Sequence, residues 1–418
     1  MPGRAVTWIN ESAATLRHAA CNLQPDDTCM NVDIAVVGAG PAGLCFARSL
    51  AGSGLSVALI ERQPLAAIAE PAFDGREIAL THASQAILAR LGLWERFDPA
   101  EVSELRDARV INGASDSGLH VRASDGRSRP LGWLVPNHLI RRAAYEAVAS
   151  QANLALLAGR AVTAAARGDD AVALTLDSGE TLRARLLVAA DSRFSGLRRM
   201  MGIGARSYDH GKRMLVCRVA IERPHGHVAW EWFGYGQTLA LLPLNGDQAS
   251  VVLTLGPQEM ARVEAMDDAA FGAELERRFL GRLGGIRPLG TRHVYPLVSV
   301  FAERFAAPRV ALVGDAAVGM HPVTAHGFNL GLQGQATLAR VVLEAHRRGE
   351  EIGDAAVLAR YGRRHQRAAW PMYAGTRLVV RVFTDDRAPV RGLREAILRV
   401  SNRVPPLRRA IAARLTQA

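Results

Sequence analysis

Four largely apolar runs along the chain each end at a glycine or an acidic residue. Runs of this length without polar alternation are typical of parallel strands that are buried on both faces. The sequence therefore predicts polar groups positioned at the ends of buried strands. The runs, each with the residue that follows it, are 33–37 (Gly38), 56–60 (Glu61), 185–190 (Asp191) and 310–313 (Gly314).

Helices and a second kind of strand pattern fill the segments between these runs. The predicted helices are residues 44–51, 84–91, 137–149, 258–282 and 327–348. Short strands with polar turns are predicted in residues 107–130, 154–157, 172–176, 181–184 and 211–255, and residues 294–297 return the chain to the first lobe. The turn spacing in 211–255 indicates an antiparallel sheet. The predicted fold class is α/β, with a Rossmann-like lobe, an inserted mixed, mainly antiparallel sheet and C-terminal helices.

The first strand, the helix after it and the second strand form a complete β-α-β dinucleotide fingerprint. Gly38, Gly40 and Gly43 give the Gly-x-Gly-x-x-Gly spacing, and Glu61 ends the second strand. The first glycine permits a tight turn, the second lets a pyrophosphate approach, and the third lets the helix pack closely. The free N–H groups at the helix start favour a diphosphate, and Glu61 is expected to accept hydrogen bonds from ribose hydroxyls.

A second ligand-binding pattern follows the last apolar run. Asp315 stands at the strand end, and a helix is predicted to begin at Gly327. A carboxylate and a bare helix N-terminus suit a ligand with hydroxyls at one end and an electron-rich ring at the other. A flavin with its ribityl chain is such a ligand.

Length and composition indicate a soluble or peripheral protein with more than one lobe. A chain of 418 residues is too long for one compact core. No apolar run reaches the ~18 residues that a membrane-spanning helix needs. The 4 cysteines include no Cys-x-x-Cys pair, so we predict no metal site and a cytoplasmic location with reduced thiols. The net charge is +11, but no DNA- or RNA-binding motif accompanies it, so nucleic acid is not an expected partner.

The two ends of the chain differ from its middle. Residues 1–29 lack the apolar stretch of a secretory signal, and we expect a disordered, dispensable extension, with Met30 an equally good translation start. Residues 388–418 combine arginines with aliphatic residues and contain one acid, Glu395. This pattern predicts basic amphipathic helices, broken at Pro405, that either dock on a membrane surface or a partner or pack as ordinary helices.

Several residues remain open between a functional and a structural role. Arg76 either meets a phosphate or is a solvated arginine. His321 and His326 either handle protons or order their loop, and because no third ligand accompanies them we predict no metal. The aromatic residues around Trp230 and Trp232 either wall a substrate pocket or belong to the core of the sheet.

Three motifs together resemble the single-component FAD-dependent aromatic hydroxylases, the p-hydroxybenzoate hydroxylase superfamily. They are the fingerprint with Glu61, the segment 191–198, which is similar to the family's Asp-Gly motif, and Gly314-Asp315, which is similar to its Gly-Asp motif. Ser192 departs from the family by replacing the usual glycine at a tight turn. The resemblance spans residues 31–400 of the chain.

One branch of that superfamily, the ubiquinone-biosynthesis hydroxylases, is matched more closely. The segments that resemble it, nearest to the demethoxyubiquinol hydroxylase sub-branch, are residues 74–80, 229–233, 241–244, 321–322 and 327–332. His326 stands where that branch usually has glutamine. The departure lies beside the expected flavin site and marks a candidate for a different ring-position preference.

The resemblance implies FAD as the cofactor and a set of contacts to it. Asp315 is expected to bind the ribityl hydroxyls, Asn137 the flavin side chain, and Asp191 with Arg198 the seam between cofactor and domains. The residues expected at the cofactor are Gly38, Gly40, Ala42, Gly43, Glu61, Arg62, Arg76, Asn137, Asp191, Asp315, Gly327, Phe328 and Asn329, and the pocket candidates are His321, Pro322 and His326.

The resemblance also implies the reaction and its partners. One oxygen atom of O₂ is transferred to the ring of a polyprenylated phenol or quinol. NAD(P)H is a transient donor, since only one dinucleotide fold is present. The basic tail is a candidate contact to the inner face of the membrane or to a ubiquinone-biosynthesis complex. The alternatives are another flavoenzyme of this fold, such as a polyprenyl reductase, a halogenase or a hydroxylase of a soluble aromatic, and a flavin-bearing scaffold or redox sensor.

These expectations divide the chain into alternating segments. Residues 30–105, 133–202 and 292–387 are predicted to build the FAD-binding domain. Residues 106–132 and 203–291 are predicted to build the substrate domain, and residues 388–418 the basic tail.

Overall fold

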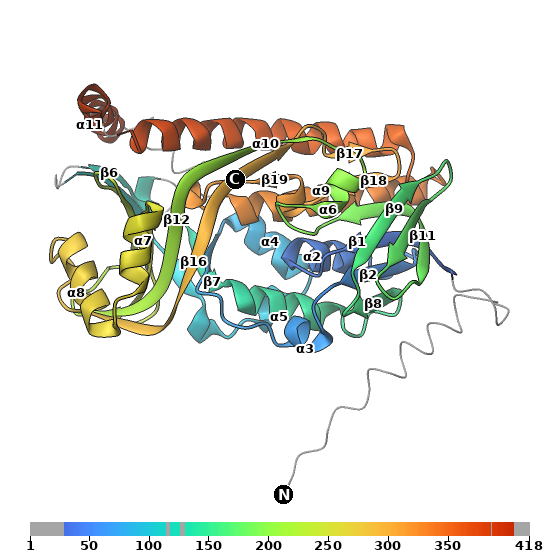
Figure 1. The fold of residues 1–418 in the computed structure, drawn as a ribbon, viewed down its shortest axis with the longest axis horizontal. Coiled ribbons are helices and arrows are strands. Elements are labelled where there is room, and N and C mark those ends of the chain that lie inside the picture. Colours follow the sequence, from blue (N-terminus) through green and yellow to red (C-terminus); the bar gives the residue numbers. More distant parts are fainter. Residues whose placement is uncertain (1–28, 114–117, 126–129, 386, 405–418) are drawn as a thin grey trace, which may run out of the picture.

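The computed structural model describes residues 29–113, 118–125, 130–385 and 387–404. Strands within these residues form two large sheets, here called sheet A and sheet C, and a small three-stranded sheet (Figure 1). Sheet A lies at one end of the elongated molecule and sheet C towards the other, while the helices α9 (Gly327–Arg347) and α10 (Ala355–Phe383) run along one side.

Sheet A carries the four apolar runs that were predicted to be parallel strands. Its main path is β17-β18-β11-β1-β2-β8, in which β17 is the short strand Ala306–Ala307. The strands with parallel pairings are β1 (Cys29–Val37), β2 (Val57–Glu61), β8 (Leu154–Ala158), β11 (Thr181–Ala189) and β18 (Val310–Leu312). Because these strands point the same way, the groups that follow β1, β2, β11 and β18 meet at one edge. The predicted parallel sheet is confirmed.

Two predicted boundaries in sheet A were wrong. Residues 181–184 and 185–190 were predicted as separate strands, but β11 is continuous because β1 pairs with it along its whole length. The first strand was expected at residues 33–37 after a disordered lead, yet β1 begins at Cys29, whose partner in the sheet is Thr181. The remainder of the predicted extension, residues 1–28, lies outside the described residues.

Helices pack on sheet A and complete one large apolar core. The helix after β1 is α2 (Pro41–Ser49), which packs against α9 and against α5 (Asn137–Val148). The helix predicted from Gly327 is confirmed as α9. The 29-residue α10 was not predicted, and it packs along α9 and places the Tyr361 hydroxyl 2.5 Å from the Leu312 carbonyl oxygen.

Sheet C has the order β19-β16-β12-β15-β14-β13-β5-β6. The four strands predicted within 211–255 are present and include antiparallel neighbours. They are β12 (Ala205–Ile221), β13 (Val228–Phe233), β14 (Thr238–Pro243) and β15 (Gln248–Leu255), flanked by β5 (Asp107–Asn112), β6 (Gly118–Val121), β16 (Ile286–Ala302) and β19 (Val318–Gly319).

Two further corrections concern sheet C. Residues 258–282 form two helices, α7 (Pro257–Glu264) and α8 (Asp268–Arg278), because the Asp267 side chain accepts a hydrogen bond from Ala270 N and starts a new helix. Residues 294–297 were expected in the first lobe. They lie inside β16, a 17-residue strand that pairs with β12 and forms the long ribbon across the molecule in Figure 1.

The small three-stranded sheet joins the two lobes where they meet. The strands β3 (Glu77–Leu80) and β4 (Ser103–Leu105) both pair with β7 (Gly132–Pro136). The tail begins as α11 (Ala388–Arg403), a helix as predicted, whereas the predicted break at Pro405 and everything after it lie outside the described residues.

Candidate active site

The glycine turn after β1 has the geometry that a dinucleotide site needs. Gly38 has φ +109°, and a side chain there would come within 2.4 Å of the Ala190 carbonyl oxygen. A side chain at Gly43 would come within 2.0 Å of the Gly38 oxygen, so α2 can pack this closely only with glycine. Gly40 precedes α2 without a capping side chain, and a Cβ there would meet no heavy atom within 4 Å. Backbone N–H groups at the start of α2 are therefore approachable by a phosphate.

Glu61 ends β2 beside this turn. Its Oε2 accepts a hydrogen bond of 2.7 Å from Ala39 N, and its Oε1 accepts one of 3.0 Å from Gln63 N. The carboxylate is thus fixed in position and keeps lone pairs for the ribose hydroxyls that it was predicted to bind. The next residue, Arg62, is exposed.

Three segments that are distant in sequence converge at Gly314. A Cβ on Gly314 would approach the Ala42 Cβ at the start of α2 to 2.9 Å. A Cβ on Gly331, in the first turns of α9, would approach the Gly314 Cα to 3.2 Å. Two helix N-termini and the 3-10 turn that carries Asp315, η4 (Gly314–Ala316), therefore form one site.

Asp315 is held by an arginine that the sequence analysis did not single out. Arg193 donates from Nε and Nη2 to Asp315 Oδ2 at 3.1 and 2.8 Å. The same guanidinium donates from Nη1 to the Val298 carbonyl oxygen in β16 at 3.0 Å. Asp315 Oδ1 takes no hydrogen bond from the described residues, so it remains available to a ligand hydroxyl. Arg193 could not be found by spacing, because its two partners lie far along the chain.

Asp191 and Arg198 hold the neighbouring strand end together. Asp191 accepts hydrogen bonds from the Ser195 hydroxyl (2.5 Å) and from Leu197 N (3.2 Å) at the start of a short helix. Arg198 is buried and donates to the Ala316 carbonyl oxygen at 3.0 Å. Arg198 thus braces the Asp315 turn, while Asp191 fixes the start of the short helix that carries Arg198.

Ser192 preserves the tight turn that its family builds with glycine. Its φ is +95°, a conformation in which an L-residue is strained. The departure from glycine therefore leaves the turn in place and adds strain to it.

A second polar cluster joins the small sheet to sheet C. Asp74 accepts hydrogen bonds from Arg76 (2.6 Å) and from Asn137 Nδ2 (2.8 Å), and its backbone oxygen accepts one from the Tyr295 hydroxyl (2.7 Å). Burial alone would raise the Asp74 pKa, but the hydrogen bonds from Arg76 and Asn137 outweigh it and lower that pKa. Negative charge at Asp315 reaches this cluster too, since it contributes to raising the Arg76 pKa. The structure brings Arg76 and Asn137, which were each predicted to contact the cofactor, to the same Asp74 carboxylate.

A buried ion pair lies beside this cluster. Arg218 in β12 donates to Glu77 Oε1 at 2.8 Å, and the Glu77 side chain has no exposed surface. Burial raises the Glu77 pKa even though Arg218 opposes the shift. The pair was not predicted, because the two residues are joined only by the packing of β3 against sheet C.

The side chain of Asn329 is used inside the protein. Its Oδ1 accepts a hydrogen bond from Thr81 N at 3.1 Å, and its Nδ2 donates to the carbonyl oxygens of Ala79 (2.8 Å) and Ala325 (3.0 Å). Any contact of this residue to a cofactor would therefore come from its backbone at the start of α9. Gly327 and Phe328, also predicted at the cofactor, form the first turn of the same helix.

The three pocket candidates lie in the loop that leads into α9. His321 Nδ1 accepts a hydrogen bond from Val323 N at 3.2 Å and so orders the turn containing Pro322. Burial, with the nearby His210, Lys212 and Arg193, lowers the His321 pKa to about 3, so the ring is neutral near pH 7. His326 is buried immediately before α9.

The aromatic residues of β13 divide between the two faces of sheet C. Trp232 is buried among apolar residues of sheet C and α8, with its ring 6.2 Å from that of Phe279, and Trp230 packs against the same cluster. Phe233 points the other way, with its ring 4.6 Å from that of Phe383 in α10. Of the two predicted roles, pocket wall or sheet core, the structure therefore assigns both tryptophans to the sheet core.

Residues 29–113, 118–125, 130–385 and 387–404 contain no cluster of three or more His, Cys, Asp or Glu side chains that could hold a metal ion. In the same part of the chain, no helix combines the length and apolarity that crossing a bilayer requires. The residues at the site fit FAD instead. Positions where a Cβ would clash shape the cradle, Glu61 and Asp315 retain free acceptor positions, and two helix N-termini face the same turn.

Comparison with known proteins gives the same cofactor. The family model described as FAD binding domain matches residues 31–376. Ubiquinone hydroxylase UbiM of Neisseria meningitidis is 46% identical over 93% of this chain and 85% of its own. Ubiquinone hydroxylase UbiL of Rhodospirillum rubrum is 38% identical, covering 90% and 87%. The 3-demethoxyubiquinol 3-hydroxylase of Escherichia coli is 31% identical, covering 90% and 96%.

A crystal structure gives the same architecture. The p-nitrophenol 4-monooxygenase PnpA from Pseudomonas putida superposes with a TM-score of 0.76 over 93% of this chain and 99% of its own, at 19% identity. That identity supports the fold alone. The family match over most of the chain and the identities above 30% establish more: the chain belongs to the FAD-binding family, in the branch of the FAD-dependent ubiquinone hydroxylases.

Proposed function

We propose that this protein hydroxylates the aromatic ring of a polyprenylated ubiquinone precursor of the demethoxyubiquinol type, with FAD and O₂. The observation that carries the proposal is the convergence of the α2 start, the Asp315 turn and the α9 start on Gly314. Relatives named as ubiquinone hydroxylases support the substrate class. NAD(P)H is the proposed donor, bound transiently.

The residues at this site would each have a separate task. The N–H groups after Gly40 would hold the diphosphate, Glu61 the adenosine ribose, and Asp315 the ribityl chain. FAD, when bound, supplies the activation of O₂. The start of α9 would stabilise negative charge on a ring bound in front of it, because the helix dipole is positive there. Arg193 would hold Asp315 in place through its bond to β16.

The remaining predicted contacts stay part of the proposal. Arg76 and Asn137 would approach the flavin side chain from the Asp74 cluster, and Arg62 would approach the adenosine end from solvent. His321 would order the pocket loop rather than carry a proton, because it is neutral and its Nδ1 is already engaged. The predicted domain segments are proposed as well, with the strand β16 kept whole in the substrate domain because it pairs with β12 in sheet C.

The function is tested by quinone profiling in a strain that lacks this protein, together with an assay of the purified protein. We expect a precursor lacking one ring hydroxylation to accumulate. The purified flavoprotein should consume O₂ and form the hydroxylated product when NAD(P)H and the quinol are supplied. Bound FAD without product from any quinol precursor would favour the scaffold or redox-sensor alternative.

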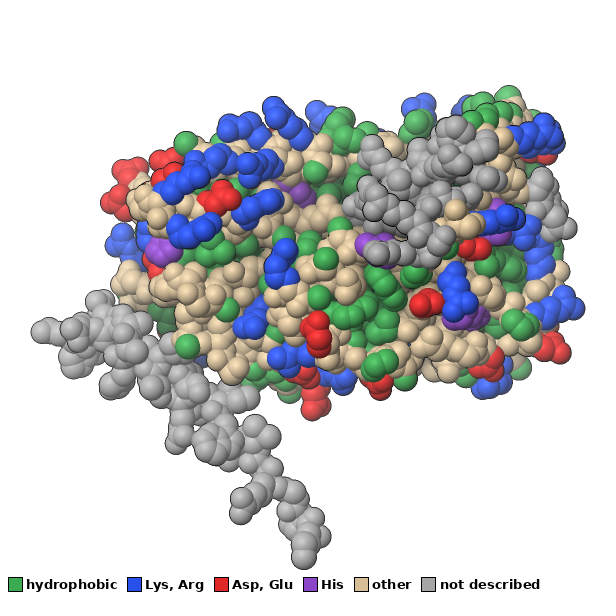
Figure 2. Space-filling model, turned by 180° about the vertical axis from the view of Figure 1, so that it is seen from behind, with side chains coloured by type: hydrophobic (Ala, Val, Ile, Leu, Met, Phe, Trp, Pro, Cys, Tyr) green, Lys and Arg blue, Asp and Glu red, His purple; other side chains and the backbone are tan. Residues whose placement is uncertain are grey.

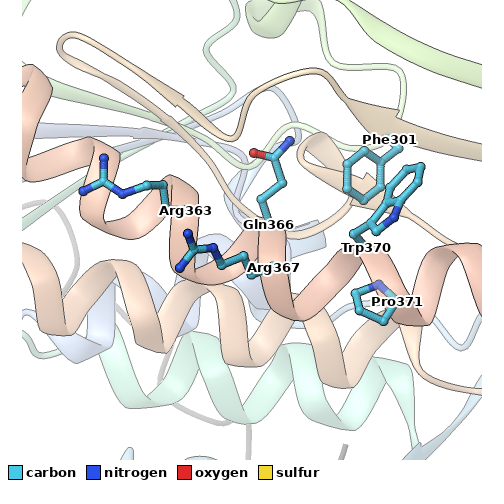
Figure 3. A pocket seen from close by; sticks show the side chains of 6 residues that line it. All are labelled: Phe301, Arg363, Gln366, Arg367, Trp370 and Pro371. Atoms are coloured by element: carbon cyan, nitrogen blue, oxygen red, sulfur yellow. The ribbon is translucent and has the colours of Figure 1, made fainter.

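A basic and aromatic surface on α10 and α11 supports a peripheral membrane contact, which we propose as part of this function. The α10 sequence contains no acidic residue, and Arg360, Arg363, Arg364 and Arg367 line one recess along it. A neighbouring recess includes Arg363, Arg367 and Trp370, whose ring meets that of Phe301 edge-on at 5.4 Å (Figure 3). Figure 2 shows Lys and Arg side chains gathered along the upper left of the molecule.

Further exposed apolar residues lie on α11, which follows the C-terminal end of α10. Leu393, Ile397, Val400 and Val404 recur at helical spacing, and all are exposed. An apolar stripe beside arginines is the pattern of a helix that lies on anionic lipid. Such a contact would bring the site to a substrate that is itself dissolved in the bilayer.

Vesicle flotation tests the contact. Each arginine near an anionic surface contributes about 1 kcal/mol, so Arg363→Glu with Arg367→Glu should weaken binding to anionic vesicles at least roughly tenfold. The matched control, Arg90→Glu with Arg183→Glu, changes exposed arginines elsewhere and should bind as wild type. Equal recovery of both double variants would contradict the contact.

A further inference from the structure

Glu231 lies on the opposite face of sheet C from the two tryptophans that flank it. Side chains alternate along a strand, and Trp230 and Trp232 point towards α8. Glu231 therefore shares its face with Phe233, which contacts α10. This is the face that the FAD-binding lobe and the C-terminal helices cover.

Pairing across the sheet puts Glu231 near the middle of one row of side chains, here called the Glu231 row. Apart from Glu231 and the histidine at its end, the row is aliphatic. Its members in order are Leu119, Val110, Glu231, Ala240, Val252, Val216 and His293. A carboxyl group thus stands alone between Val110 and Ala240 on an apolar surface.

Both ends of the Glu231 row touch segments next to the cofactor site. At one end, a Cβ on Gly75 would approach Val216 and His293 to 2.8 Å each. At the other end, Leu119 and Val110 belong to a cluster with Val323, which follows Pro322 in the loop before α9. The segments 74–77 and 321–326 therefore lie at the two ends of the Glu231 row, and the Glu231 side chain lies between them.

No described residue donates a hydrogen bond to the Glu231 side chain, although this side chain is only partly exposed. Burial raises the Glu231 pKa to about 8, and no nearby charge offsets the shift. The titratable groups on the same face are distant or engaged. Arg218 is paired with Glu77 and Glu101, and His293 is four strands away, about 19 Å at ~4.8 Å per strand.

Among the described residues, the elements that pack on this face place no acidic side chain against Glu231. Tyr295 in β16 donates to the Asp74 backbone oxygen. His321 in the covering loop is neutral, Arg391 in α11 stacks on the Tyr235 ring at 3.8 Å, and Arg394 is bonded to the Val382 carbonyl oxygen. Glu231 is the carboxyl group that this face offers to a bound ring.

We propose that Glu231 accepts the proton of the phenolic hydroxyl of the substrate, an inference that rests on the proposed function. The phenol O–H bond breaks, the proton moves to a carboxylate oxygen of Glu231, and the bonding electron pair stays on the phenolate oxygen. Electron density at the neighbouring ring carbon rises, which favours oxygen transfer to it. The proton returns to the product when the ring leaves.

The unusual environment suits this task. A carboxyl group of ordinary acidity is a weak base towards a phenol, whose pKa is about 10. A base is most effective when its pKa lies near the operating pH, and Glu231 meets that condition because it is surrounded by aliphatic side chains. The same surroundings would receive the rest of an apolar substrate.

The experiment compares Glu231→Gln, Glu231→Asp and the control Glu264→Gln, an exposed glutamate of α7, in the FAD-loaded protein. Wild type should show kcat/KM rising with pH up to about 8. Glu231→Gln should bind FAD normally, lose the rise and lower kcat roughly 10²–10⁴-fold. It should also return more of the consumed O₂ as hydrogen peroxide. Glu231→Asp should keep the rise at a reduced rate.

Two outcomes would overturn the inference separately from the function. If Glu231→Gln forms product within threefold of wild type and keeps the same pH profile, Glu231 is not the proton acceptor while the hydroxylase function stands. If wild type forms no product, the proposed function fails and the role of Glu231 fails with it. Glu264→Gln should match wild type throughout.

Discussion

Acidic side chains at the edge of sheet A accept hydrogen bonds from the part of the protein that the structure describes, whereas Glu231 on one face of sheet C does not. At the edge of sheet A, Glu61, Asp191 and Asp315 each accept at least two hydrogen bonds from the protein. On the face of sheet C, Glu231 accepts none from the described residues. The first arrangement fixes a binding frame before any ligand arrives, whereas the second leaves one group uncommitted and therefore able to exchange a proton.

The largest expected effect comes from the ion pair at the seam between these regions. Arg218→Ala should destabilise the protein by about 3–5 kcal/mol, because it leaves Glu77 buried without its charged partner. Urea unfolding measures the loss. The double variant Arg218→Met with Glu77→Leu should recover most of it. A loss below about 1 kcal/mol in the single variant would show that the pair does not hold the seam.

Gly43→Ala tests how rigid the edge of sheet A is. The new methyl group would overlap the Gly38 carbonyl oxygen, so we expect a loss of about 1–3 kcal/mol and release of FAD. Thermal unfolding and flavin fluorescence report the two effects. Gly375→Ala is the matched control, because Gly375 also lies inside a helix but a Cβ there would meet no heavy atom within 4 Å. Full retention of FAD by Gly43→Ala would contradict the view that the site requires close packing of α2 on the glycine turn.

Asp315→Ala separates ligand binding from folding within the same region. The variant should weaken FAD binding roughly tenfold to a hundredfold, because one charged hydrogen bond contributes about 1.5–3 kcal/mol. Desalting followed by an absorbance spectrum measures retained FAD, and circular dichroism should show an intact fold. Asp170→Ala, an exposed control, should remain yellow. Undiminished yellow protein after Asp315→Ala would remove Asp315 from the site.

A smaller effect is expected when the stability of Glu231→Gln is measured instead of its activity. Burial raises the Glu231 pKa from its ordinary value of 4.5 to about 8, so the folded protein favours the protonated form. That contribution to stability is fully present below pH 4.5 and is lost as pH rises towards 8. Wild type should therefore lose about 1 kcal/mol or more relative to Glu231→Gln between pH 5 and pH 9. Parallel stability curves would show that the carboxyl group is solvated.

The smallest expected effect is a gain. Ser192→Gly should stabilise the protein by about 1 kcal/mol, because glycine adopts a φ of +95° without strain. A rise in Tm with unchanged FAD content would show that the turn geometry is fixed by its surroundings. A drop in Tm would mean that the serine side chain contributes a contact that outweighs the strain.

The edge of sheet A could be predicted from sequence because its chemistry is local. Gly38, Gly43 and Glu61 sit within one β-α-β unit, where spacing and residue type determine the geometry. Asp315 was singled out for the same reason, as a strand end followed by a helix. Its partner Arg193 was not, because an ion pair between segments 122 positions apart leaves no local pattern.

The face of sheet C could not be predicted in this way. The β12–β16 pairing joins segments that the chain separates by the whole of β13 to α8, and the pattern at 294–297 showed only a fragment of β16. Glu231, between two tryptophans, could not be singled out from the sequence, since its proposed role depends on which face each side chain takes and on what lies across the sheet. The burial of α10 against α9 depends on the same kind of distant packing.

The long strand β16 also fixes the distance between the Glu231 row and the Asp315 turn. His293, at the end of the Glu231 row, and Val298, whose oxygen holds Arg193, belong to one uninterrupted strand. β16 then pairs through Val300 with Gly319, just beyond Asp315. A strand hardly stretches, so the distance between the Glu231 row and the Asp315 turn is fixed by the number of residues in β16. One inserted residue between His293 and Val298 would add about 3.3 Å and turn the following side chains over.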